Sequence, residues 1–111
     1  MQLPNATNLE RPMSFETWLI AGLAITYDDA VAVLSAPHFI ERDTRRTAAG
    51  AEAHWSFRFP CGTKVAIVLS VPYDEARIFA DPPNTSDVIQ YLQPLIEERE
   101  IRVADPPILI R

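Results

Sequence analysis

Hydrophobic and polar side chains alternate strictly in one stretch near the middle of the chain, from His54 to Phe59. The residues of one parity are aromatic, namely Trp55, Phe57 and Phe59, and those of the other parity are polar. Because successive side chains of a β-strand point to opposite faces, this period of two predicts a half-buried strand with an aromatic inner face. The rest of the predicted fold is arranged around this strand.

Two further strands are predicted directly after it. Val65 to Val71 is apolar on both faces, which is typical of a central strand covered on each side, and a third run extends from Ala76 to Ala80. Pro60 and Gly62 suit the tight turn between the first two strands, since proline has a fixed φ and glycine adopts a positive φ freely. The connections are too short for a crossover helix, so the three runs predict an antiparallel meander.

The residues before the meander are predicted to contain a mostly buried helix. Apolar side chains recur at helical spacing between Ser14 and about Ile25, and the segment carries a single charge. A strand from Trp18 to Ile25 is the competing interpretation of the same residues. The periodicity alone does not decide between the two.

A second helix is predicted to begin after Thr26. Thr26 and Asp29 have the spacing of a capping box, in which the first side chain accepts a hydrogen bond from the backbone three residues later. Pro37 should end this helix near Ser35, because proline restricts the residue before it. A short strand from His38 to Asp43 is expected to follow.

In the last third of the chain, the residue pattern predicts a helix that is interrupted by proline. Asn84 has the spacing of a helix cap, and Pro94 should kink or split the helix because it lacks a backbone N–H. A one-sided apolar stripe consists of Val88, Leu92, Leu95 and Ile96. Beyond it, Ile101 to Val103 alternates like a short strand. A break at Asp105, Pro106 and Pro107 then precedes an apolar extended tail, Ile108 to Ile110.

These elements predict an α+β fold. An antiparallel β-meander of three to four strands should pack against N-terminal helices and a C-terminal helix. Residues 1–13 are expected to form a flexible tail, and residues 14–111 a single globular domain of ordinary size.

Composition and charge narrow the classes of function. Hydrophobic residues make up 48% of the chain, which is enough for a real core, and the formal net charge of −5 argues against general nucleic-acid binding. Cys61 is the one cysteine, so no internal disulfide forms. The first residues do not resemble a signal peptide, and Trp18 to Ile25 is too short to span a bilayer. We therefore expect a cytoplasmic protein that binds no membrane.

No catalytic motif is present. Three glycines, at positions 22, 50 and 62, exclude a glycine-rich phosphate loop, and the sequence contains no HExxH, paired CxxC or GxSxG. His38, His54 and Cys61 are the residues that suit a soft metal, but their ordinary interpretation is two edge histidines and a turn cysteine. We expect no enzymatic activity, no cofactor and no metal site.

Two pairs of adjacent carboxylates also have an ordinary interpretation. Asp28 and Asp29 suit a helix N-terminus, where negative charge is favoured, and Asp74 and Glu75 suit a solvated turn. Neither pair is expected to act in acid–base catalysis or to hold a hard cation.

An acidic protein without catalytic motifs is expected to act by binding. The leading hypothesis is an inhibitor of another protein, such as an immunity protein or antitoxin that neutralises a basic toxin enzyme. The residues predicted to meet this partner are Asp74, Glu75, Glu97, Glu98 and Glu100. The first alternative is a dimeric chaperone or adaptor whose apolar grooves accept an extended peptide. The second is an unrecognised small enzyme or ligand-binding domain.

Overall fold

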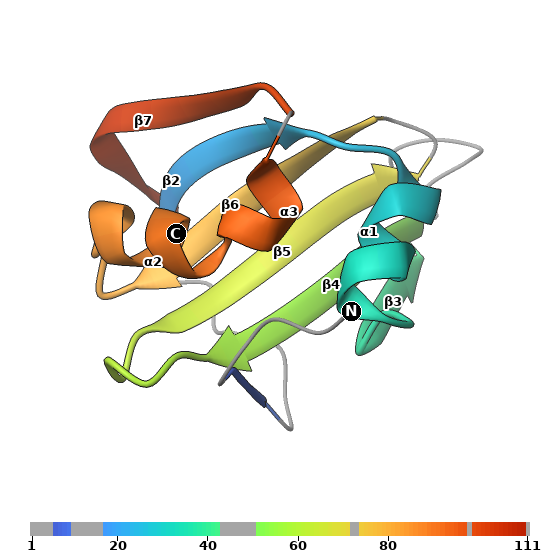
Figure 1. The fold of residues 1–111 in the computed structure, drawn as a ribbon, viewed down its shortest axis with the longest axis horizontal. Helices are drawn as coiled ribbons and strands as arrows, with labels where there is room; N and C mark the ends of the chain where they lie inside the picture. The colour runs from blue at the N-terminus through green and yellow to red at the C-terminus, as the bar shows by residue number, and fades with distance from the viewer. Residues whose placement is uncertain (1–5, 10–16, 43–50, 72–73, 98, 111) are drawn as a thin grey trace.

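A computed structural model describes residues 6–9, 17–42, 51–71, 74–97 and 99–110. These residues form a seven-stranded sheet and three short helices (Figure 1). The strands are β1 (Thr7–Asn8), β2 (Thr17–Ala24), β3 (Phe39–Arg42), β4 (Ala51–Arg58), β5 (Lys64–Val71), β6 (Glu75–Asp81) and β7 (Ile101–Ile110). The helices are α1 (Tyr27–Leu34), α2 (Thr85–Tyr91) and α3 (Gln93–Ile96).

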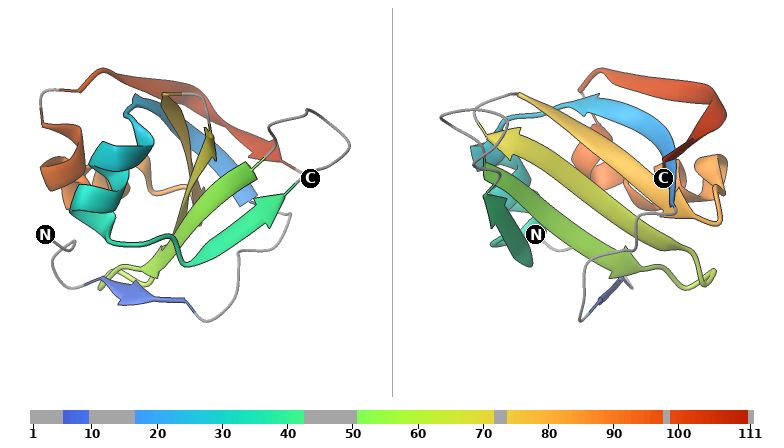
Figure 2. Two further views of the ribbon diagram at one scale, coloured as in Figure 1. Left: turned by 90° about the vertical axis from the view of Figure 1, so that its right-hand side faces the viewer. Right: turned by 180° about the vertical axis from the view of Figure 1, so that it is seen from behind.

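All strand pairs of the sheet are antiparallel. The order is β1-β4-β5-β6-β2-β7, and β3 pairs with β4 beside this path. The sheet curves around the helices, which lie together on its inner face (Figure 2). The predicted α+β class is confirmed. The predicted sheet of three to four strands is too small, and the helices are interspersed along the chain rather than mainly N-terminal.

The predicted helix from Ser14 to Ile25 is wrong over the part that the structure describes, because Thr17–Ala24 is strand β2. β2 lies between β6 and β7 and pairs with both. Leu19 pairs with Phe79 and Ala21 with Ile78, so Ile20 is the extra residue of a β-bulge. The consecutive side chains of Ile20 and Ala21 are both buried as a result. This β-bulge interrupts the alternation that would have indicated a strand.

The meander and its turn are confirmed. β4, β5 and β6 pair in sequence, and Gly62 adopts a φ of 90° in the turn between β4 and β5. The turn closes with two backbone hydrogen bonds, from Phe59 N–H to the Thr63 carbonyl at 3.0 Å and from Gly62 N–H to the Phe59 carbonyl at 2.8 Å. A positive φ at this position needs glycine, as the sequence predicts.

Two helix signals act as predicted and a third acts differently. The Asp29 N–H donates to Thr26 Oγ1 at 3.1 Å at the start of α1. Pro94 lies in the first turn of α3, where α3 is separated from α2. The Asn84 side chain, however, makes no cap, and its Nδ2 donates instead to the buried Thr63 Oγ1 at 2.9 Å.

Both faces of β5 are buried, as predicted for a central strand. Its inner face joins the main core between sheet and helices, where Trp55 and Phe59 are among the largest fully buried side chains. On the outer face, Ala66 and Val68 of β5 form a second, smaller cluster with Phe79 of the neighbouring β6, and Leu19 packs against it.

β7 pairs with β2 in two separate stretches. Ile101–Val103 pairs with residues 21–23 of β2, and Ile108–Ile110 pairs with residues 17–19. The predicted break at Asp105–Pro107 therefore interrupts the pairing. Within the predicted N-terminal tail, Thr7 and Asn8 pair with β4 as β1, and residues 1–5 and 10–13 lie outside the described residues.

Candidate acidic hollow and a second cavity

A hollow of about 220 Å³ lies on the outer face of the sheet, where β6, β2 and β7 run side by side. Its lining residues are Gly22, Ala24, Asp74, Glu75, Glu100 and Arg102. Leu23 points into the core, so its neighbours Gly22 and Ala24 present the opposite face of β2. We refer to this site as the acidic hollow.

The register of the three strands explains the carboxylates of the hollow. Ala24 pairs with Glu75 of β6 on one side, and its N–H donates to the Glu100 carbonyl oxygen at 2.9 Å on the other. Glu75 and Glu100 therefore flank the same residue of β2. The Ile25 N–H donates to the Asp74 carbonyl oxygen at 3.1 Å, which holds the third acidic residue at the same end of the sheet.

Small residues on β2 make the space between these side chains. Gly22 has no side chain and Ala24 has one methyl group, while their cross-strand neighbours are long. Glu75 extends over Gly22, because its Oε1 lies 2.9 Å from the position that a Cβ at residue 22 would occupy. Gly22 therefore leaves room for the Glu75 carboxylate against the sheet.

The charges of the hollow are mostly negative. Arg102 Nε lies 3.9 Å from Glu100 Oε1, and both side chains are largely exposed, so this ion pair contributes little. Arg77, which pairs with Gly22 from β6, is engaged elsewhere: its Nη2 bonds to Glu52 Oε2 at 2.7 Å, and its guanidinium lies over the Phe79 ring. The hollow thus contains three carboxylates and one arginine that is only weakly paired.

The structure brings together three of the five predicted partner-binding residues. Asp74, Glu75 and Glu100 line the hollow, whereas Glu97 is exposed at the end of α3 and does not line it. Glu98 lies outside the described residues.

Sequence reasoning missed Gly22, Ala24 and Arg102 as lining residues. The lone glycine inside an apolar run was the available signal, since glycine within a strand indicates close approach of a neighbour.

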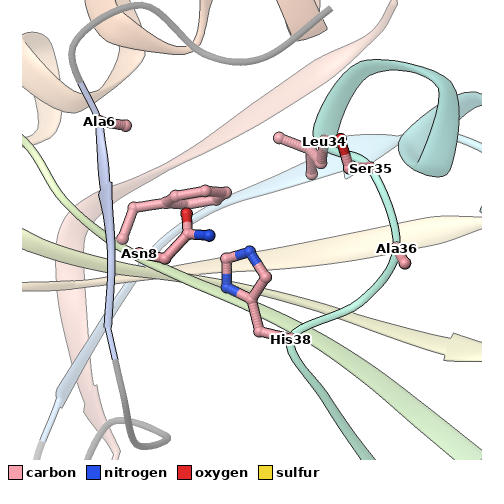
Figure 3. Close-up of a pocket in the computed structure, with 7 residues that line it drawn as sticks. Ala6, Asn8, Leu34, Ser35, Ala36 and His38 are labelled. Carbon is pink, nitrogen blue, oxygen red and sulfur yellow. The ribbon is translucent and has the colours of Figure 1, made fainter.

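A second cavity, of about 180 Å³, lies near the other edge of the sheet (Figure 3). Its polar lining side chains come from three segments: Asn8 of β1, Ser35 at the end of α1, and His38. Figure 3 shows the Asn8 amide and the His38 ring turned toward the same space. Its apolar wall consists of Ala6, Leu34, Ala36 and Phe57.

The protonation of His38 follows from its surroundings. The Ser56 N–H donates to His38 Nδ1 at 3.1 Å, and the ring packs edge-on against Phe57 at 5.0 Å between centroids. Burial lowers the pKa of His38 below its ordinary value of 6.5. The imidazole is therefore neutral at pH 7, with Nδ1 as acceptor and its proton on Nε2.

The structure does not assemble a metal site from the candidate residues. Within the described residues, no three His, Cys, Asp or Glu side chains are close enough together to hold a metal ion. Cys61 is exposed in the turn, and its Sγ lies 3.4 Å from Thr63 Oγ1.

The chain matches no known family model, and no curated protein or solved structure is significantly similar to it. Over the part of the chain that the structure covers, none of the helices has the length and hydropathy to cross a bilayer.

Proposed function

We propose that this protein is a cytoplasmic inhibitor that binds and blocks a basic partner protein, in the manner of an immunity protein or antitoxin. The observation that carries the proposal is the acidic hollow, which is lined by Asp74 and Glu75 at the start of β6 and by Glu100 just before β7. The formal net charge of −5 acts in the same direction. A partner with a basic surface is attracted to such a site from a distance.

The exposure of these carboxylates predicts how they act. Solvated charges at the rim of an interface accelerate the encounter more than they slow dissociation. Salt should suppress the effect, because the screening length is about 10 Å at 0.1 M ionic strength. Affinity would then come from apolar groups buried at the centre of the interface.

The test begins with a pull-down of basic proteins by the immobilised chain, followed by measurement of association and dissociation rates at low and high salt. In the variant Asp74→Asn, Glu75→Gln, Glu100→Gln, association should slow by roughly tenfold at low salt, with little change in dissociation. The control for position is Asp87→Asn, which neutralises one exposed carboxylate on α2 away from the hollow.

Equal association rates for the wild type and the triple variant, at both salt concentrations, would show that the acidic surface only keeps the protein soluble. The inhibitor proposal would then fail in its electrostatic form. A reduced rate in the Asp87 control of the same size would equally remove the assignment to the hollow.

Two alternatives each have one supporting observation. The dimeric chaperone or adaptor is supported by the exposed apolar side chains of β7, and it predicts a dimer in sedimentation experiments. The ligand-binding domain or small enzyme is supported by the cavity at His38. It predicts a bound small molecule in native mass spectrometry.

A further inference from the structure

β7 is the last strand in the order of the sheet, and its outer edge is open as far as the structure describes the chain. Figure 2 shows β7 bordering the sheet beyond β2. The strand carries four of the five large hydrophobic side chains found exposed among the described residues. They are Val103 at 49%, Ile108 at 52%, Leu109 at 37% and Ile110 at 38%. An exposed apolar edge strand is a template for pairing with another chain.

The backbone of β7 shows which groups are available there. The Ala24 N–H donates to the Glu100 carbonyl oxygen, so residue 100 turns its hydrogen-bonding groups toward β2. In antiparallel pairs these groups alternate in direction along the strand. Arg102 therefore also faces β2, and Ile101 and Val103 direct their N–H and C=O groups to the open edge.

This part of the edge adjoins the acidic hollow. Arg102 lies opposite Gly22 and Glu100 lies opposite Ala24, so both side chains are on the outer face beside the hollow. A residue on an added strand would lie about 5 Å from its direct neighbour on β7 and about 7–8 Å from the diagonal one. A lysine or arginine side chain spans that distance to the Glu100 carboxylate.

We propose that the open edge of β7 at Ile101–Val103 accepts an extended strand of the partner by β-strand addition, and that this strand alternates apolar and basic side chains. Backbone hydrogen bonds supply the pairing, Val103 contacts the apolar side chains, and the hollow receives the basic ones. A second copy of this chain fits less well, because its net charge of −5 repels an identical acidic edge. The inference rests on the proposed function and specifies its binding mode.

The experiment uses the full chain and a synthetic probe. The probe is a capped seven-residue peptide of alternating valine and lysine, and a second peptide carries glutamate in place of lysine. Backbone amide shifts and amide hydrogen exchange are followed by NMR. The lysine peptide should slow exchange at the Ile101 and Val103 amides and should bind at least tenfold more tightly than the glutamate peptide.

Two substitutions at one position test the edge. Val103→Pro removes an N–H that faces the open edge and leaves the hydrogen bonds to β2 in place, as proline allows at a sheet edge. Val103→Lys keeps the N–H and places a charge where the apolar side chains of the added strand would pack. This variant is used if the proline variant does not fold. Either should weaken the lysine peptide at least tenfold. The control is Ile40→Ala, an exposed apolar residue on β3.

The possible outcomes distinguish a failure of the strand-addition inference from a failure of the proposed inhibitor function. Suppose that a basic partner is captured and that its association rate depends on the carboxylates, but neither Val103 variant changes its binding. This outcome overturns strand addition and leaves the proposed function in place. Equal binding of the two peptides overturns the basic strand. If the protein dimerises and Val103→Lys abolishes the dimer, the edge of β7 binds a second copy of the chain, and the inference is overturned as well. Peptide pairing at the edge with no basic partner found supports strand addition and counts against the inhibitor function alone.

Discussion

Replacement of Phe57 by alanine tests the assignment of the inner face of β4. Phe57 is 4% exposed and belongs to the main core, where its ring stacks near Phe59 and meets the edge of His38. Burial of a whole phenylalanine side chain contributes roughly 1.5–3 kcal/mol of transfer free energy, and the cavity that the missing ring leaves adds to the loss. Phe57 also lines the second cavity, so water can enter the space that it leaves. We therefore expect a loss near the lower end of the usual 3–5 kcal/mol range.

Urea unfolding followed by tryptophan fluorescence measures this loss, and thermal unfolding should show a decrease in Tm of roughly 12–24 °C for about 3 kcal/mol. Ile40→Ala is the control, because Ile40 is 61% exposed and its truncation should change the free energy of unfolding by less than about 0.5 kcal/mol. A loss below about 1 kcal/mol for Phe57→Ala would refute the argument that this ring stabilises the core.

Three further predictions concern the turn, Gly22 in the acidic hollow, and the second cavity. Cys61→Ser should leave the free energy of urea unfolding unchanged within about 0.5 kcal/mol, because the thiol is exposed and the serine hydroxyl can replace it as hydrogen-bonding group beside Thr63; a larger loss would contradict this. Gly62→Ala should cost roughly 1–2 kcal/mol in the same assay, since the φ of Gly62 is 90°. Gly22→Ala should cost less, because only the flexible end of the Glu75 side chain must move to make room for the methyl group. Equal costs for the two substitutions would refute the argument. Burial lowers the pKa of His38, so the unfolded chain binds the proton more readily: the free energy of unfolding should fall as pH drops from about 6.5 toward the folded-state pKa, and an equally steep decline in His38→Gln would assign it to other groups.

Local signals in the sequence were sufficient for several elements. The strict alternation around Trp55 and Phe57 defined β4, because side chains on a strand alternate whatever the surrounding fold. Thr26 caps α1 and Pro94 separates α2 from α3, since a side-chain cap and a missing backbone N–H act within one helical turn. These features depend on residues only a few positions apart.

The tertiary structure decided what depends on pairing between distant segments. β2 is a strand because β6 and β7 pair with both of its edges, and the bulge at Ile20 concealed its period from the sequence. The same register sets Glu75 and Glu100 on either side of Ala24, although the two residues lie far apart in the sequence. The open edge of β7 likewise follows from its position as the last strand. A one-residue shift in register would move every side chain of a strand to the opposite face, so the set of side chains that meet in the hollow depends on a register that no local pattern determines.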